Sequence, residues 1–332
     1  MGRVAVLGAG KVGHRHLEAY QRVPGAEVVG ILEPHEERLS AALADLARSI
    51  PRYASLDDVL SDPEVDVVDI CSPTPLHFEQ VCRSLRAGKT VFCEKPLVPS
   101  VAEVEEIARL LSTADTSLRV GYVYRSHPRI ELLKQRLDDE VLGTPYMAVF
   151  RIGGRGSHRA WKHGRASGGG ALLDMASHML DLAYWFFGGI DEVESLYSGL
   201  LLSKREIDGE QVEVDADDVV IVRLRTLTGV EILVHADFLS PGFANWIEVS
   251  GKNGSALVSI ISGLPDRYVL RSAARGLPAG ETLEQGRPVN MLERELAAFI
   301  ADVNERRVVK DIDASLLVAQ VVESFMERSR GA

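Results

Sequence analysis

The stretch "VAVLGAGKVG", residues 4–13, decides the fold of the first part of the chain. A short Val- and Leu-rich run predicts a buried strand, and Gly8, Gly10 and Gly13 then open a helical pattern in G-x-G-x-x-G spacing. Gly8 permits a tight turn, Gly10 lets a pyrophosphate approach the backbone, and Gly13 lets helix and strand pack closely. Unpaired N–H groups at the helix start attract phosphate. We therefore expect a dinucleotide on this loop, whose remaining residues are Lys11 and Val12.

An acidic residue follows at the distance that a dinucleotide fold requires. Twenty residues after Gly13, the next expected strand ends in "GILEP", which places Glu33 where a carboxylate binds a ribose 2′-hydroxyl. A carboxylate at this position repels a 2′-phosphate, so NAD is the predicted cofactor. Arg38 lies close enough in sequence to keep NADP open as the alternative.

The first 122 residues alternate short apolar runs with helical patterns. The expected strands are "RVAVLG", "AEVVGIL", "VDVVDIC", "TVFCEK" and "LRVGY". Because parallel strands need crossover connections, this alternation predicts an α/β domain with a doubly wound parallel sheet over residues 1–122.

The pattern changes after Ser126–Ile130, and strand-like stretches then follow one another. Turn sequences such as "TLTG" and "GKNG" favour hairpins, so residues 123–332 predict an α+β domain with a largely antiparallel open sheet. Gly263–Val289, rich in Pro and Gly, is expected to be irregular. Two helical patterns follow, and we expect the last helix to pack back on the first domain. They cover Leu292–Arg306 and Ala314–Arg328.

Composition narrows the class of protein. With 332 residues, a net charge of −11 and a pI near 5.4, the chain has no basic field to attract a nucleic acid. No run reaches membrane-spanning length, and the beginning lacks a signal-type apolar region. The three cysteines have no metal-type spacing, which indicates reduced thiols. We expect a cytoplasmic protein that binds neither nucleic acid nor membrane.

Polar residues follow two of the expected strands, where an open parallel sheet binds its ligands. "CSPTPLH" at Cys71–His77 is a stiff loop that can bind the cofactor, although a plain connection explains it nearly as well. "CEKP" at Cys93–Pro96 places Glu94 and Lys95 at the next strand end. Glu94 and Lys95 can form a salt-bridged pair at the sheet edge. Alternatively, Lys95 can transfer a proton or orient the substrate. The candidate cofactor contacts in the first loop are Ser72, Pro73, Thr74 and His77.

The helical pattern "GGGALLDMASHMLDLAYWFFGG", residues 168–189, carries Asp174, His178 and Asp181 on one face. A histidine beside a carboxylate suits general acid–base chemistry near neutral pH. Gly168–Gly170 would let a substrate or nicotinamide approach the backbone. A metal site and a surface charge cluster are the alternatives, and we expect no metal because no further His or Cys in this segment completes a ligand shell.

A basic segment precedes this helix. "RGSHRAWKHGR", Arg155–Arg165, and Arg125 offer cations to an anionic substrate group, although a solvated loop is equally consistent with the pattern. The candidate contacts are Arg125, Arg155, Arg159, Trp161, Lys162 and Arg165.

These motifs together resemble the glucose–fructose oxidoreductase/inositol dehydrogenase/MocA family of NAD(P)-dependent dehydrogenases. The resemblance is carried in order by "GAGKVG", "SPTPLH", "EKP", "GGGALLDMASHMLD" and "ELAAFIADV". It implies a Rossmann domain followed by an α+β domain, with Lys95, Asp174 and His178 as the catalytic group, which also contacts substrate. It further implies that Glu94 and Lys95 touch the cofactor and that His77 and Tyr122 lie near the nicotinamide.

The function implied is hydride transfer between nicotinamide and a secondary alcohol carbon of a sugar, inositol or nucleotide-linked sugar. His178 would take the hydroxyl proton, Asp174 would orient its ring, and Lys95 would stabilise the alkoxide. Two alternatives stay open: an NAD-assisted glycoside hydrolase or lyase, and a dinucleotide-sensing protein without turnover.

The second half also predicts assembly. Runs such as "VVIVRLRTL" and "VEILVHADF" are apolar on both alternation phases, and too few helices follow to cover two sheet faces. We therefore expect a homodimer or homotetramer built by sheet-to-sheet contact.

Overall fold

The structure, a computed structural model, describes residues 1–44, 50–154, 160–165, 168–207, 209–261 and 263–330. It divides into two compact units. The first comprises Met1–Val123 and Asn290–Ala319, and the second Tyr124–Val289 and Gln320–Ala332.

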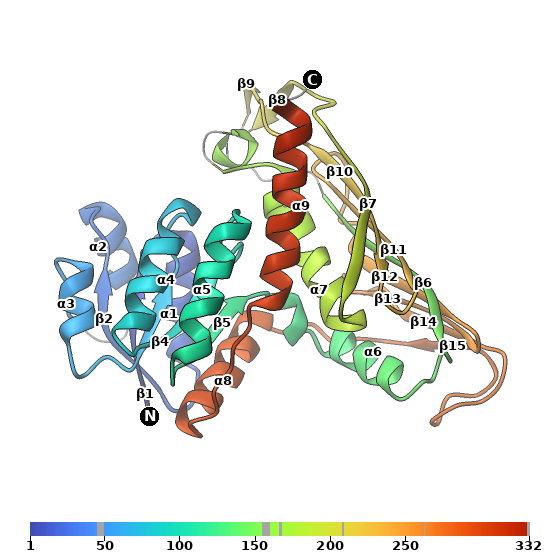
Figure 1. Cartoon of the computed structure of the whole chain (residues 1–332), viewed down its shortest axis with the longest axis horizontal. Coiled ribbons are helices and arrows are strands. Elements are labelled where there is room, and N and C mark those ends of the chain that lie inside the picture. Colours follow the sequence, from blue (N-terminus) through green and yellow to red (C-terminus); the bar gives the residue numbers. More distant parts are fainter. Residues whose placement is uncertain (45–49, 155–159, 166–167, 208, 262, 331–332) are drawn as a thin grey trace. The chain divides into compact units, whose positions relative to one another are not determined.

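The first unit contains a sheet of five parallel strands in the order β2-β1-β3-β4-β5 (Figure 1). The order reverses direction at β1, as in doubly wound sheets whose ligands bind beyond the carboxyl ends of the strands. The strands are β1 (Gly2–Leu7), β2 (Ala26–Leu32), β3 (Val67–Ile70), β4 (Thr90–Glu94) and β5 (Leu118–Gly121).

Helices cover both faces of this sheet. Along β1, Val4 and Val6 pack into one core with α1 and α2, while Ala5 and Leu7 pack into the other with α3, α4 and α5. The predicted doubly wound parallel sheet is confirmed. The helices are α1 (Lys11–Tyr20), α2 (Glu36–Ala44), α3 (Leu56–Ser61), α4 (His77–Arg86) and α5 (Val101–Thr113).

A helix from the far end of the chain completes the first of these cores. Leu296, Phe299 and Ile300 of α8 (Met291–Asn304) pack with residues of β1, α1 and β4. The Phe299 ring meets the Phe92 ring edge-on at 5.3 Å between centroids. The last helix, α9 (Asp313–Arg330), begins in the first unit and ends in the second.

The second unit is built on an eight-stranded sheet in the order β15-β14-β13-β12-β6-β11-β10-β7. All neighbouring strands are antiparallel except β6 and β11, so the predicted largely antiparallel sheet is confirmed. The strands are β6 (Pro145–Gly153), β7 (Ile190–Gly199), β10 (Val219–Thr226), β11 (Glu231–Asp237), β12 (Trp246–Gly251), β13 (Gly254–Ser259), β14 (Asp266–Leu270) and β15 (Gly280–Glu284).

One face of this sheet carries the helices of the unit, α6 (Pro128–Asp138) and α7 (Ser177–Phe187), as Figure 1 shows. Burial alternates along the strands, with Val220, Val222 and Leu224 of β10 inside and Arg223 exposed. On the opposite face the outward row Tyr197–Ile221–His235 crosses three strands.

The expectation of irregular chain over Gly263–Val289 is wrong. Residues 266–270 and 280–284 form the antiparallel pair β14–β15 at the sheet edge, and Tyr268 reaches the core. These strands have five residues each, too short to show a clear alternation among the flanking Gly and Pro. A separate hairpin joins β8 (Lys204–Ile207) to β9 (Glu210–Glu213).

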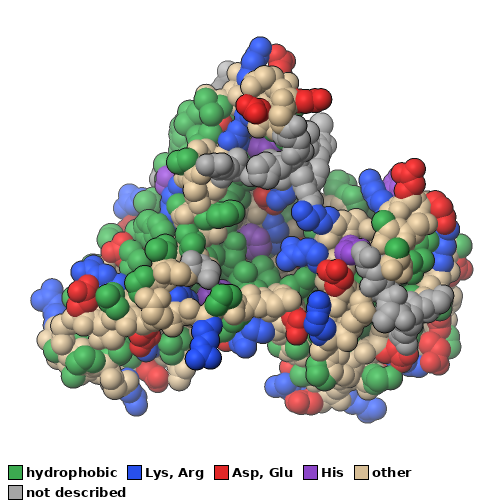
Figure 2. All heavy atoms as spheres, turned by 180° about the vertical axis from the view of Figure 1, so that it is seen from behind, with side chains coloured by type: hydrophobic (Ala, Val, Ile, Leu, Met, Phe, Trp, Pro, Cys, Tyr) green, Lys and Arg blue, Asp and Glu red, His purple; other side chains and the backbone are tan. Residues whose placement is uncertain are grey.

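The surface is mixed in character. On the face that Figure 2 shows, acidic and basic side chains lie interspersed, with hydrophobic side chains between them. Among the residues that the structure describes, no helix combines the length and the apolar character needed to cross a bilayer.

Candidate active site

The glycine loop joins β1 to α1, and each of its three glycines meets a different constraint. Gly8 has φ +92°, and a Cβ on it would lie 3.0 Å from the carbonyl oxygen of Cys71. A Cβ on Gly13 would lie 1.9 Å from the carbonyl oxygen of Gly8. Gly10, by contrast, has no heavy atom within 4 Å of its Cβ position. The loop is therefore closed where strand and helix pack and open where a pyrophosphate would lie.

Glu33 follows β2 and holds the glycine loop from the side. Its side chain is 4% exposed, one oxygen accepts the Ala9 N–H at 2.8 Å, and the other accepts the His35 N–H at 2.9 Å. The remaining lone pairs of a carboxylate can accept from ribose hydroxyls. These residues fit a dinucleotide, which would lie with its pyrophosphate at the start of α1 and its ribose at Glu33.

The loop after β3 is tied to the loop after β4 by His77. The His77 ring is 1% exposed; its Nδ1 lies 3.0 Å from the carbonyl oxygen of Pro96, and its Nε2 lies 2.9 Å from that of Ser72. His77 thus fixes the two loops relative to each other, and its predicted contact with the cofactor stays a prediction. Ser72 donates its hydroxyl to Gln80 at 2.6 Å. Pro73 is exposed and Thr74 half-buried at the start of a 3-10 turn.

Glu94 and Lys95 stand at the end of β4. One Glu94 oxygen lies 3.1 Å from Nε2 of His16, and the other accepts the backbone N–H of Lys95 at 3.2 Å. Burial would raise the pKa of Glu94, but the hydrogen bond and charge of His16 and the charge of Lys95 outweigh it, so the pKa is lowered. The Glu94 carboxylate therefore stays ionised beside the lysine.

In the second unit, the segment predicted as one regular helix begins with a π-helical turn, Leu172–Ala176. Asp174 lies on this turn, whereas His178 and Asp181 lie on α7, whose regular spacing begins after it. Such turns are frequent at functional sites because they displace a side chain from the regular helical face.

Each carboxylate of this segment pairs with a cation from elsewhere in the unit. Lys162 donates to Asp174 at 2.5 Å, with both side chains about one-fifth exposed. Arg125 donates through Nε to the buried Asp181 at 2.9 Å and through a second nitrogen to the other oxygen. Two of the cations predicted to meet an anionic substrate are thus engaged with carboxylates.

Tyr124 is a site residue that the sequence prediction missed. Its ring meets the His178 ring edge-on at 4.8 Å between centroids, and burial together with the Asp174 charge raises the pKa of Tyr124 to about 12. Tyr122, predicted near the nicotinamide and substrate, is a core residue 1% exposed, with its hydroxyl 3.5 Å from that of Ser315, and its predicted role stays a prediction. The sequence feature that could have indicated Tyr124 is the end of β5 at Gly121. Beyond that residue, the alternation of a strand no longer predicts which side chains face the core.

The glycines before the π-helical turn serve a structural purpose. A Cβ on Gly170 would lie 2.3 Å from Oδ1 of Asp217, and one on Gly169 would lie 2.3 Å from the carbonyl oxygen of Lys162. Asp217 accepts the Leu172 N–H at 2.8 Å, and burial raises its pKa to about 6. Gly169 and Gly170 therefore make room for the protein itself, where the sequence suggested room for a ligand.

The basic segment before this turn is described only in part. Lys162 and Arg165 are described, and Arg165 is exposed with its guanidinium 5.9 Å from the Phe325 ring centroid. Arg155, Arg159 and the side chain of Trp161 lie outside the described part of the chain.

Comparisons with known proteins agree with this architecture. An oxidoreductase family with an NAD-binding Rossmann fold matches residues 2–122, and the GFO/IDH/MocA C-terminal domain matches residues 130–257. The myo-inositol 2-dehydrogenase of Thermotoga maritima is 30% identical over 253 residues, covering 76% of this chain and 73% of that protein. The levoglucosan dehydrogenase of Pseudarthrobacter phenanthrenivorans is 27% identical over 322 residues, and the match covers 84% of this chain and 82% of that protein.

Among solved structures, a levoglucosan dehydrogenase in complex with NADH and levoglucosan superposes with a TM-score of 0.86 at 20% identity, covering 99% of this chain and 97% of that one. This likeness concerns the fold. Together with the two family matches, it agrees with the Rossmann topology and the open sheet described above. The chain therefore belongs to the glucose–fructose oxidoreductase/inositol dehydrogenase/MocA family of oxidoreductases, with an NAD-binding Rossmann domain.

Proposed function

We propose that this oxidoreductase transfers hydride reversibly between NAD and a secondary alcohol carbon of a sugar or polyol. Bound NAD supplies the hydride acceptor. The observation that carries the proposal is the acid–base group of the second unit, in which Tyr124 packs against His178 and Lys162 holds Asp174. A histidine whose ring is oriented by a carboxylate can take a hydroxyl proton near neutral pH, and we assign that carboxylate to Asp174, four residues before His178.

In this proposal each residue has one task. His178 accepts the proton of the substrate hydroxyl, Asp174 orients the His178 ring, and Lys95 stabilises the negative charge that develops on the oxygen. Glu94, kept ionised, balances the charge of Lys95. We assign residues 1–122 to the cofactor and the rest of the chain to substrate binding and assembly, except residues 290–319, which return to the first unit.

The pairing of the cations bears on the substrate class. Lys162 and Arg125 are bound to carboxylates, so among the described residues of the second unit the charge offered to an anionic substrate is reduced. This favours a neutral sugar or inositol over a nucleotide-linked sugar. The named relatives are dehydrogenases for myo-inositol and levoglucosan, and both of these compounds are neutral polyols.

The test is a screen for NADH formation with inositols, monosaccharides, anhydrosugars and sugar nucleotides. We expect turnover with a neutral member and little with sugar nucleotides. Two outcomes would contradict the proposal. Cleavage of a glycoside without net NADH would indicate NAD-assisted hydrolysis or elimination, and tight NAD binding without turnover on any substrate would indicate a sensor.

We also propose that the chain assembles into a homodimer, or a tetramer of such dimers, through the outward face of the eight-stranded sheet. This face presents large apolar side chains, including Tyr197 at 50% exposure, Met147 at 44% and Leu233 at 38%. Sedimentation equilibrium at low micromolar concentration tests the assembly. A monomer mass would refute it without affecting the catalytic proposal.

A further inference from the structure

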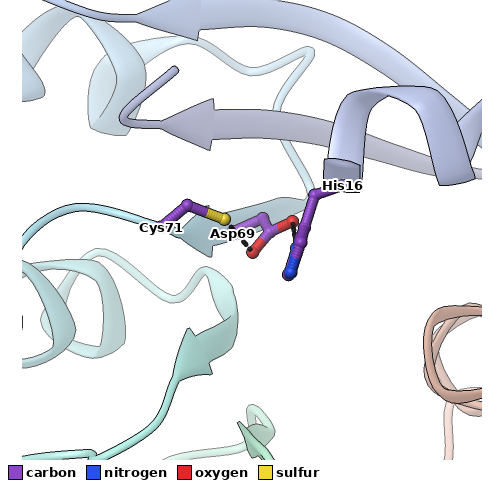
Figure 3. Close-up of side chains that lie close together, drawn as sticks. All are labelled: His16, Asp69 and Cys71. Atoms are coloured by element: carbon purple, nitrogen blue, oxygen red, sulfur yellow. Dashed lines mark hydrogen bonds and ion pairs between the residues drawn. The ribbon is translucent and has the colours of Figure 1, made fainter. Parts of the chain in front are cut away.

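A buried cluster of ionisable side chains lies in the first unit, outside the catalytic group (Figure 3). His16 comes from α1 and Asp69 from β3, as Figure 3 shows. Glu94, at the end of β4, is the third member. The side chains of His16 and Asp69 are fully buried. Burying charge is costly unless it is paired, so this cluster calls for a physical reason.

The geometry fixes the protonation state of His16. Nδ1 lies 2.8 Å from an oxygen of Asp69, and Nε2 lies 3.1 Å from an oxygen of Glu94. Carboxylates only accept hydrogen bonds, and a neutral imidazole has one donor nitrogen. A neutral ring would therefore direct a lone pair at a carboxylate, whereas the imidazolium donates to both.

The electrostatics agree with this reading. Burial alone would lower the pKa of His16, but the Asp69 carboxylate raises it well above its usual value. Other titratable groups around the network are Cys71, Tyr20 of α1, Lys95 and Glu295 of α8. Burial raises the pKa of both the Cys71 thiol and the Tyr20 hydroxyl, so these two stay neutral.

A metal ion is the competing explanation, because ligand atoms of His16, Asp69 and Cys71 lie within 4.8 Å of one another (Figure 3). The 2.8 Å separation of the His16 nitrogen and the Asp69 oxygen is, however, that of a direct hydrogen bond. A metal would also require the Cys71 thiolate, which burial disfavours. The arrangement favours a hydrogen-bonded ion network.

The network leads to the proposed catalytic lysine. His16 fixes one oxygen of Glu94, and the other oxygen accepts the backbone N–H of Lys95. Gly121 leaves space for this carboxylate, since a Cβ there would lie 3.1 Å from its oxygen. At the other end, His16 lies on the helix whose first turn follows the glycine loop. A continuous chain of hydrogen bonds thus joins the dinucleotide-binding helix to the turn that carries Lys95.

We infer that His16 is a positioning residue: as an imidazolium held by Asp69, it fixes Glu94 and thereby places Lys95 relative to the helix that binds the cofactor. The inference rests on the proposed function for the role of Lys95. The charge state of His16 does not depend on it.

The charge state is tested first, by NMR of the full chain labelled with ¹⁵N-histidine, with NADH bound. We expect both nitrogens of His16 to be protonated at about pH 8, where an ordinary histidine is neutral. The signals are assigned by their absence from His16→Gln. A neutral His16 in the folded protein, or signals displaced by stoichiometric added Zn²⁺, would overturn the inference.

The positioning role is tested by kinetics of His16→Gln and His16→Asn. Both side chains are uncharged and carry their N–H donors on a single nitrogen, whereas the imidazolium donates from two. We expect kcat to fall about 10- to 100-fold in both variants, while the Kd for NADH changes by less than about threefold, because small misplacement acts on the chemical step. His14→Gln, two residues earlier on α1 and paired with Glu18, is the matched control and should retain kcat.

The turnover of Lys95→Ala, measured in the same assay, distinguishes failure of the proposed function from failure of the positioning role of His16. If Lys95→Ala loses turnover and both His16 variants keep it, the positioning role is wrong and the proposed function stands. If Lys95→Ala keeps turnover, the role proposed for Lys95 is wrong, and the positioning role falls with it. An equal loss of NADH binding and kcat in the His16 variants would reduce His16 to a structural residue.

Discussion

The two units hold their ionisable side chains in different ways. In the first unit, Asp69, His16 and Glu94 form one connected, buried network that spans three elements of secondary structure. In the second unit, Asp174 and Asp181 are separate, each paired with its own cation from a distant segment. The first arrangement fixes one geometry cooperatively, since displacing one member disturbs all of them. The second connects each carboxylate to a cation of a different segment.

The two units also differ in the backbone elements that carry these charged side chains. The first unit presents its charges at the ends of strands in a sheet buried on both faces. The second presents them on a π-helical turn and the helix after it, where the Leu172 N–H donates to Asp217. The positions of the charged side chains are therefore set by the parallel sheet in the first unit and by the π-helical turn in the second.

The largest expected effect tests whether both units supply the catalytic group. Lys95→Ala and His178→Ala should each lower kcat about a thousandfold, because each removes a group that acts in the proton step. The Kd for NADH should change only a few-fold in either variant, since the glycine loop holds the cofactor. Stopped assays of turnover and fluorescence titration measure the two quantities. Near-normal turnover in one variant would confine the chemistry to the other unit.

The dependence of the second unit on its local irregularity is tested by Gly170→Ala. The added methyl would collide with Asp217, at a position with φ +116°, so we expect a loss of about 3 kcal/mol in unfolding free energy. Gly168→Ala is the control: its φ is +75° and nothing lies within 4 Å of the added atom, so a loss of about 1 kcal/mol is expected. Urea denaturation measures both variants. Equal losses of unfolding free energy would show that the Asp217 side chain moves away from the added methyl without cost.

The next effect concerns the first unit and its cofactor. Glu33→Ser should weaken NADH binding about tenfold, because it removes acceptors for the Ala9 N–H and for the ribose hydroxyls. NADPH binding should not weaken, because the substitution removes the carboxylate that repels the 2′-phosphate. The ratio of the affinities for NADH and NADPH should therefore become smaller. Glu37→Ser, exposed on α2, is the control. Tighter binding of NADPH than NADH to the unaltered protein would refute the prediction and point to Arg38.

The smallest effect concerns the connected network. The pKa of His16 is higher in the folded than in the unfolded chain, so its stabilisation is complete below the unfolded pKa and declines as pH rises toward the folded one. The stability advantage of the protein over His16→Gln should therefore shrink by less than about 1 kcal/mol between about pH 6 and pH 7. Urea denaturation at the two pH values measures it. An advantage that grows with pH would show that His16 is neutral when folded.

The sequence predicted those features that depend on local spacing. The glycine loop, Glu33 at the end of β2 and the two sheet types follow from periodicity and from the positions of Gly, Pro and charged residues. Each of these is a statement about neighbours within some twenty residues. Such neighbours are close in the fold whatever the rest of the chain does.

The remaining features depend on partners far apart in the sequence. The helical period places His16 on the buried face of α1 with Leu17 and Tyr20, but it does not show that Asp69 and Glu94 lie there too. In the same way, Gly170 signals a special backbone without revealing that Asp217 occupies the space. Tyr122 and Tyr124 both follow the end of β5 at Gly121, yet Tyr122 is buried in the core and Tyr124 packs against His178.

The place of α8 in the first core has a consequence for how the protein is made on the ribosome. The residues that complete the core around Phe92 lie two hundred or more positions after it, so this part of the core stays open until most of the chain has been synthesised. A gene fragment ending at residue 122 would encode the complete parallel sheet with α1 and α2, and yet lack the α8 side chains that complete this core. Early release of the nascent chain would leave Phe92, Val4 and Val6 less well covered and prone to aggregation, so the folding of the first domain depends on the last eighth of the chain.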